Sequence, residues 1–184
     1  QWAPLQDAQR AIRIVRQNAE QWNIDGSQIG VMGFSAGGHL ASTLGTHYNE
    51  DTLKGINTDP INSVSARPDF MMLIYPVITF DKKHYHGGSK NALVGKNAKQ
   101  ETVDYFSNNL QVTADTPSTF LVHSADDKAV PVANSILFYE ALVKQNVPAE
   151  MHLYPEGGHG YSFAIGKGRL QGWTDRLYEW IREL

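Results

Sequence analysis

Short hydrophobic runs along the chain alternate with longer segments of mixed character. Residues 28–34, 70–75 and 119–123 are mostly apolar, which is typical of strands covered on both faces of a sheet. Residues 150–154 instead alternate between apolar and polar positions and stop at Pro155. We interpret each of these runs as a strand.

The longer segments carry apolar residues at the three- and four-residue spacing of an amphipathic helix. The first begins near Pro4, a residue suited to the first turn of a helix, and extends to about Trp22. Strands that alternate with helices predict βαβ units, and hence an α/β fold with a mostly parallel sheet and helices on both faces. The further helices are expected at residues 36–47, 100–106, 131–145 and 171–184.

Two stretches break this regular alternation. Residues 49–68 are polar and contain proline breakers, which predicts a loop. Residues 77–99 have no clear period, and a loop of this length inside a compact domain is usually functional. We therefore expect a lid-like insertion over about residues 76–110.

Composition narrows the class of protein further. The 184 residues suffice for a single domain with a hydrophobic core. The net charge of −3 gives no basic excess, so we expect neither a nucleic-acid partner nor an anionic membrane partner. The chain has no cysteine, which excludes disulfides and thiolate metal sites within it.

A G-x-S-x-G motif follows the first predicted strand, as Gly33-Phe34-Ser35-Ala36-Gly37. A strand, a sharp turn and a helix are the setting in which this motif presents a serine nucleophile. We expect the glycines on either side of Ser35 to remove Cβ atoms that would clash where strand and helix close up. The alternative is a glycine-rich turn with an incidental serine.

Ser35, Asp127 and His159 each fall just after a predicted strand. In a parallel sheet these positions meet at one edge, where active groups are normally found. A serine hydroxyl needs a base, and the base needs an orienting acid. His159 is the candidate base and Asp127 the candidate acid, although the adjacent Asp126 is also placed to serve. The chain order Ser, Asp, His is the order expected in α/β-hydrolases.

Seven histidines compete for the role of base. His159 is set apart because it lies in a glycine-flanked loop after the last predicted strand; the alternative is a turn histidine satisfied by backbone. The pair His84 and His86 lacks a third convergent ligand, so a loop is favoured over a metal site. For the others we expect packed or hydrogen-bonded roles at His39 and His123, a strand position at His152, and surface or loop positions at His47, His84 and His86.

Three stretches resemble the α/β-hydrolase esterases, and in particular the branch of acetylxylan esterases and related carbohydrate esterases: residues 33–39 (GFSAGGH), 122–131 (VHSADDKAVP) and 154–160 (YPEGGHG). Residues 86–95 and 112–117 are similar to that branch as well, so the likeness covers nearly the whole chain. In these enzymes the acid lies four residues before the proline of D-x-x-V-P. The resemblance therefore implies Asp127 rather than Asp126.

The chain departs from the family pattern at its start. The resemblance implies several strands, and an H-G-G-type oxyanion loop, ahead of the nucleophile strand. Here the serine is already at position 35. We expect the Ala36 backbone N–H to be one oxyanion donor, the second donor to come from an upstream segment, and the chain to be the C-terminal portion of a longer α/β-hydrolase domain.

The resemblance implies a serine carboxylic-ester hydrolase that removes acetyl groups from plant-polysaccharide sugars and needs no metal or cofactor. Its substrate would be a small-molecule or polysaccharide ester. One alternative is a serine peptidase domain of the prolyl-oligopeptidase type, which has similar motifs. Another is a non-catalytic binding module that retains the triad residues by descent.

Overall fold

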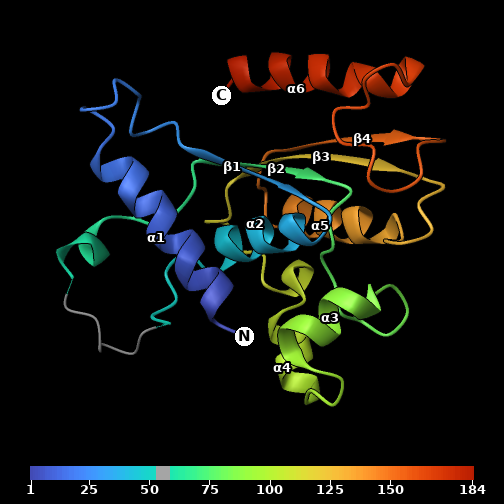
Figure 1. The fold of residues 1–184 in the computed structure, drawn as a ribbon, viewed down its shortest axis with the longest axis horizontal. Helices are drawn as coiled ribbons and strands as arrows, with labels where there is room; N and C mark the ends of the chain where they lie inside the picture. Colours follow the sequence, from blue (N-terminus) through green and yellow to red (C-terminus); the bar gives the residue numbers. More distant parts are fainter. Residues whose placement is uncertain (53–58) are drawn as a thin grey trace.

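Four parallel strands form the centre of the structure, a computed structural model that describes residues 1–52 and 59–184 (Figure 1). The sheet order β1-β2-β3-β4 follows the order of the strands in the chain. The α/β architecture predicted from the hydrophobic pattern is therefore confirmed. The strands are β1 (Gly30–Phe34), β2 (Phe70–Ile74), β3 (Ser118–Ser124) and β4 (Ala149–Tyr154).

The strands pair with their carboxyl ends nearly level. Ile74 at the end of β2 lies between Phe34 of β1 and Val122 of β3. Ser124 at the end of β3 pairs with Tyr154 at the end of β4. Because the strands are parallel, the segments that follow them leave the sheet at the same edge.

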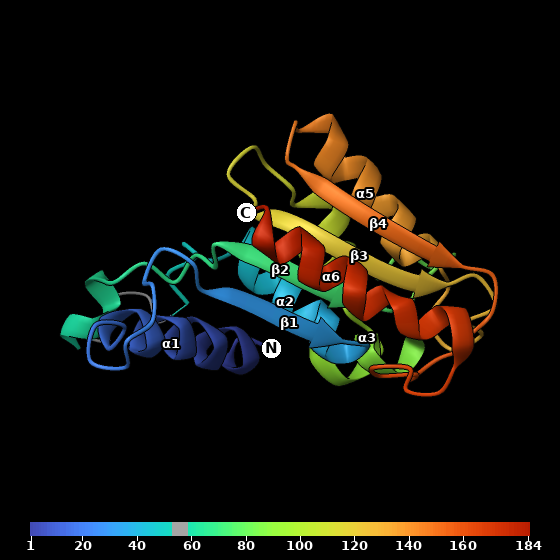
Figure 2. The same cartoon turned by 90° about the horizontal axis from the view of Figure 1, so that it is seen from above.

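Helices cover both faces of the sheet, as the pattern predicted. In Figures 1 and 2, α2 (Ala36–Thr46) and α5 (Ala133–Lys144) lie on one face, and α6 (Trp173–Arg182) crosses the other. The first helix, α1 (Ala3–Gln17), packs beside α2. It ends earlier than expected, because the backbone turns from about residue 18.

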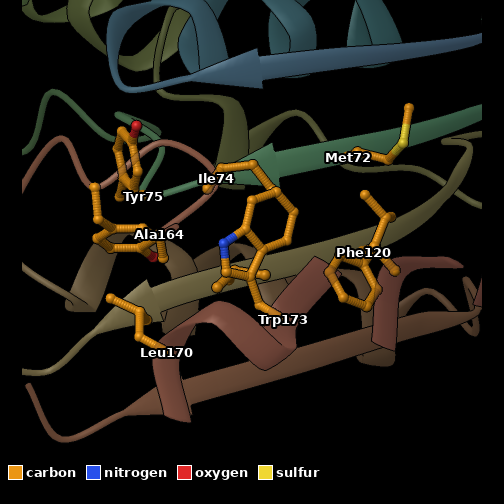
Figure 3. Close-up of a cluster of buried hydrophobic side chains, with 10 residues drawn as sticks. Met72, Ile74, Tyr75, Phe120, Ala164, Leu170 and Trp173 are labelled. Atoms are coloured by element: carbon orange, nitrogen blue, oxygen red, sulfur yellow. The ribbon is translucent and has the colours of Figure 1, made fainter. Parts of the chain in front are cut away.

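The two central strands, β2 and β3, are buried on both faces, and β2 is apolar throughout. Met72 and Ile74 of β2 point to the α6 face, where Trp173 lies among the side chains of β2 and β3 (Figure 3). Met71 and Leu73 point the other way, toward α2 and α5. Trp173, Met71, Leu73 and Ile74 each have essentially no exposed surface. Burial of such side chains contributes roughly 1.5–3 kcal/mol each, so this alternation fixes the register of the sheet.

The region expected to be an irregular insertion contains two short helices, α3 (Gly87–Val94) and α4 (Gln100–Tyr105). The second was predicted, but the first was not. None of the α3 residues is buried, so it has no apolar face that a periodic pattern could reveal. A local hydrogen bond defines its start instead, since the His86 ring accepts from the Ser89 N–H at 3.2 Å.

The polar stretch 49–68 is a loop where the structure describes it, with a short 3-10 helix at Pro60–Ser63. Asp59 caps this turn by accepting a hydrogen bond from the Ile61 N–H. The remainder of the predicted loop, residues 53–58, lies outside the described residues. Within the described ranges, no helix combines the length and the apolar character needed to cross a bilayer.

The glycines of the motif around Ser35 do not contribute equally to the turn. A Cβ on Gly33 would lie 2.3 Å from the Gly37 carbonyl oxygen, and one on Gly38 would lie 2.6 Å from the Cβ of Pro76. A Cβ on Gly37 would have no neighbour within 4 Å. Gly33 therefore removes a Cβ clash between strand and helix, as expected. The same expectation was wrong for Gly37, and on the helix side it is Gly38 that avoids a clash.

We predict that Gly33→Ala lowers the free energy of unfolding by about 1–3 kcal/mol, because strand and helix must separate to admit the methyl group. The matched variant Gly37→Ala should be neutral or stabilise by up to about 1 kcal/mol, since alanine favours the helix. Urea denaturation of both variants measures the difference. Equal stability of the two variants would contradict this account of the turn.

Candidate active site

Ser35 stands at the sharp turn between β1 and α2. Its backbone angles are φ 52° and ψ −120°, a conformation that residues with a Cβ rarely adopt. Backbone hydrogen bonds hold it there, because its N–H donates to the Ile74 carbonyl at 3.1 Å and its carbonyl accepts from the Val77 N–H at 3.0 Å. Hydrogen bonds therefore connect the turn to the end of β2 and to the segment that follows β2.

The structure brings Ser35, His159 and Asp127 into one hydrogen-bonded chain. The Ser35 Oγ lies 2.8 Å from His159 Nε2, and His159 Nδ1 lies 2.6 Å from Asp127 Oδ2. An ionised carboxylate only accepts hydrogen bonds, so Nδ1 carries the ring proton in this arrangement. The Nε2 lone pair then faces the serine hydroxyl and can accept its proton.

The carboxylate of Asp127 is buried, with no exposed side-chain surface. Burial by itself would raise its pKa. Hydrogen bonds from His123 and His159 and from two backbone N–H groups of its own loop outweigh that effect and hold the pKa of Asp127 at about 2. The group is accordingly ionised at neutral pH, as an orienting acid requires.

The adjacent Asp126 has a different position. Its Oδ1 accepts a hydrogen bond from the Gly158 N–H at 2.8 Å, and Ser124 donates its hydroxyl to the Gly158 carbonyl. Gly158 has a φ of +63°, in the left-handed region that favours glycine. These two hydrogen bonds hold its N–H and its carbonyl directly before His159. Asp126 thus contacts the loop that carries the imidazole, whereas Asp127 contacts the imidazole itself.

Tyr75 is a part of the site that sequence reasoning did not assign. It follows β2 with a φ of +38°, and its ring packs edge-on against the His159 ring at 4.9 Å between centroids. Its hydroxyl accepts a hydrogen bond from the Ser162 N–H at 3.0 Å. Burial raises the pKa of Tyr75, so the hydroxyl stays protonated at neutral pH. In the sequence it ends an apolar run, and no local signal marks its contact with His159.

A cavity of about 400 Å³ opens beside the turn. The Ala36 N–H, at the start of α2 and directly after Ser35, donates to no backbone or side-chain acceptor among the described residues. The lining comes from α1, from α2 and from the region predicted as a lid: Pro4, Ala36, Leu40, Phe80, Leu93 and Phe106 among others.

Of the other described histidines, His123 contacts the hydrogen-bonded chain Ser35–His159–Asp127, through the carboxylate of Asp127. His39 is buried, as expected of a packed residue. Its Nε2 donates a hydrogen bond to the Phe106 carbonyl at 2.8 Å, and its Nδ1 lies 3.3 Å from the Thr43 hydroxyl. His47 lies in the bend after α2, so it has the expected loop position, but it is only 5% exposed and packs against Tyr105. His84 pairs with the carboxylate of Asp81. In the described part of the chain no three metal-ligating side chains gather into a cluster.

Comparison with known proteins gives a family for the chain. A family model described as BD-FAE matches residues 2–142. The chain is 39% identical over 175 residues to endo-1,4-beta-xylanase B of Butyrivibrio fibrisolvens, covering 95% of the chain and 27% of that protein. It is 33% identical over 185 residues to acetylxylan esterase of Xylanibacter ruminicola, covering 98% of the chain and 36% of that protein.

Among solved structures, an acetyl ester-xyloside bifunctional hydrolase from Caldicellulosiruptor lactoaceticus superposes with a TM-score of 0.92 and 47% sequence identity. The superposition covers 98% of this chain and 65% of that one. The chain thus spans about a third of the length of the curated relatives and less than two thirds of this structural relative.

The depressed pKa of Asp127 predicts how stability depends on pH. Its pKa rises from about 2 in the folded protein to its ordinary 3.8 on unfolding. The carboxylate therefore contributes about 2 kcal/mol of stability above about pH 4, which is lost as the pH falls to 2. Urea unfolding of the wild type and Asp127→Asn should show a stability gap that narrows over this interval. A gap that is constant from pH 5 to pH 2 would contradict the prediction.

Proposed function

The chain belongs to the BD-FAE family of α/β-hydrolase esterases, and we propose that it hydrolyses carboxylic esters, with acetyl groups on xylan-type sugars as its substrates. The observation that carries this proposal is the hydrogen-bonded chain Ser35–His159–Asp127 at distances of 2.8 and 2.6 Å. The names of two relatives, an acetylxylan esterase and an acetyl ester-xyloside hydrolase, support the choice of substrate.

In the first half of the reaction, the Ser35 Oγ attacks the acyl carbon while His159 Nε2 takes its proton. The carbonyl oxygen becomes an oxyanion, toward which the Ala36 N–H donates a hydrogen bond. Asp127 stays ionised and holds the imidazolium in place. The carbon–oxygen bond to the sugar then breaks as His159 returns the proton to the leaving alkoxide, which leaves an acyl-enzyme on Ser35.

In the second half, water replaces the sugar. His159 removes a proton from the water as it attacks the acyl carbon, and the same proton then returns to Ser35 Oγ when the ester bond breaks. The products are acetate and the free serine. The side chains in this cycle return to their starting protonation states, so the site is ready for another ester.

We also propose that residues 76–110 act as a lid-like insertion over the acyl or sugar group. Phe80 and Phe106 within that region line the 400 Å³ cavity together with Ala36 at the start of α2. Both phenylalanines are buried in a hydrophobic cluster against which Leu93 and Val94 of α3 and Val103 and Tyr105 of α4 also pack. This lining supports a role for the insertion in contacting a substrate bound at Ser35 and in excluding water from it.

We predict that Ser35→Ala lowers kcat for acetylated xylan and for p-nitrophenyl acetate by at least ~10³-fold, since Ser35 supplies the hydroxyl that contacts His159 Nε2 among the described residues. Release of acetate and of p-nitrophenol measures the rates. Equal rates for the wild type and the variant would rule out the assignment of Ser35. Faster cleavage of a proline-containing peptide than of acetylated xylan would instead favour a peptidase.

The two adjacent acids provide a matched control. Asp127→Asn should lower kcat by about 10³–10⁴-fold, because the amide no longer fixes the proton of His159 on Nδ1. Asp126→Asn keeps an oxygen that can accept from the Gly158 N–H, so it should retain most of the activity. The reverse order of the two variants would show that Asp126 is the acid.

A further inference from the structure

We propose that His123 is a positioning residue for the reaction: its Nε2–H holds Asp127 Oδ2 from the strand side, so that the carboxylate lies fixed between two imidazole rings, those of His123 and His159. The proposal rests on the hydrolase function proposed above for Ser35. It assigns to His123 an influence on the reaction that goes beyond packing, although the ring touches neither the substrate nor the serine.

The contacts of His123 determine which nitrogen carries its proton. Nε2 lies 3.1 Å from the Val130 carbonyl oxygen and 3.2 Å from Asp127 Oδ2. A carbonyl oxygen can only accept, so Nε2 must donate, and its proton is shared between the two oxygens. In the neutral ring, Nδ1 then accepts from the Ser135 hydroxyl, which lies at 2.8 Å.

The environment of His123 leaves the ring little freedom. It lies in β3 with no exposed surface, and its partner Ser135 at the start of α5 is also fully buried. Hydrogen bonds at both ring nitrogens fix its rotation. His159, by contrast, lies on a loop between left-handed glycines and is partly exposed. The fully buried ring therefore anchors the carboxylate to which the partly exposed ring of His159 is hydrogen-bonded.

The carboxylate of Asp127 has all of its acceptor positions in use. Oδ1 accepts from the Ala129 and Val130 N–H groups, each at 2.9 Å. Oδ2 accepts from His123 and His159. Four hydrogen bonds match the roughly four lone-pair positions of a carboxylate. Loss of His123 would leave one of them empty on a side chain that water does not reach.

The other titratable groups that face Asp127 are tyrosines. Tyr75 and Tyr161 both lie close enough for its charge to raise their pKa, in addition to the larger effect of burial. Both therefore stay neutral at neutral pH. Within the described residues, the ion pairs of Asp127 involve His123 and His159 and no lysine or arginine. Hydrogen bonds, and not a lysine or arginine, thus stabilise this buried charge. The loss of any one donor would therefore leave the carboxylate less stabilised.

The consequence for the reaction concerns how the charge of Asp127 is shared. While His123 donates to Oδ2, part of the negative charge is taken up by that hydrogen bond. Without it, the whole charge of Oδ2 acts on His159 and favours the protonated, inactive form of that ring. The acid limb of the pH profile should then move to higher pH, and the plateau should fall because the carboxylate keeps only three of its four hydrogen bonds and is held less precisely.

The test compares His123→Leu, which removes the donor, with His123→Gln, whose amide nitrogen can still reach Oδ2. Thr119→Val is the matched control, because Thr119 is another buried polar residue of β3, and its hydroxyl donates to the Pro117 carbonyl at the opposite end of the strand from His123. For each protein kcat and KM for p-nitrophenyl acetate are measured from pH 4 to pH 9, together with stability in urea.

For His123→Leu we expect kcat/KM at the plateau to fall about tenfold through kcat, with KM little changed, and the acid limb to move up by roughly one pH unit, since one hydrogen bond to a charged group is worth about one pKa unit. His123→Gln should recover most of both losses. Thr119→Val should lose stability without moving the acid limb. A His123→Leu profile that coincides with that of the wild type, or the same shift in Thr119→Val, would overturn the proposal.

A second measurement keeps the proposal testable if His123→Leu does not fold. Nitrogen-15 NMR of the wild type should show His123 with its proton on Nε2, and a proton on Nδ1 alone would overturn the proposal. The two hypotheses also fail differently. If Ser35→Ala is as active as the wild type, the proposed function fails; if Ser35 is required but the His123 variants leave the profile unmoved, only the role of His123 fails.

Discussion

The level, parallel pairing of the strands is the constraint on which the rest of the structure depends. Because β1, β3 and β4 end at the same edge of the sheet, Ser35, Asp127 and His159 come together although 124 positions separate the first from the last. A shift of one residue would exchange the side chains that β2 directs toward α6 with those that it directs toward α2 and α5. Burial of both faces of the central strands therefore stabilises the fold and positions the site at once.

At that edge, Asp127 links the loops to each other. Its own loop supplies two N–H donors, β3 supplies His123 and the loop after β4 supplies His159. Asp126 and Ser124 hold the peptide that precedes the same imidazole. A buried carboxylate is costly unless its acceptors are all used, so this saturation explains how a charge can persist here. The position of the His159 ring beside Ser35 therefore depends on how completely Asp127 is bound.

Much of this could be predicted from the sequence. Short apolar runs gave the strands, and glycines around Ser35 and His159 indicated turns after them, because both signals are local. What was missed depends on contacts between distant segments. The helix α3 buries none of its residues and so leaves no periodic pattern. The packing of Tyr75 on His159 and the burial of His47 arise only when separate elements meet. Which glycine near Ser35 avoids a steric clash could not be predicted either, because the clash at Gly38 is with Pro76 of a distant segment.

The central claim is that the contacts at the sheet edge make Ser35 a nucleophile. Covalent labelling with a fluorophosphonate, followed by peptide mass spectrometry, tests it most directly, because the reagent reacts with serines that a base activates. The account predicts one equivalent of label, located on Ser35, and none after denaturation in urea. An unlabelled protein, or label distributed over other serines such as Ser89 or Ser124, would contradict it.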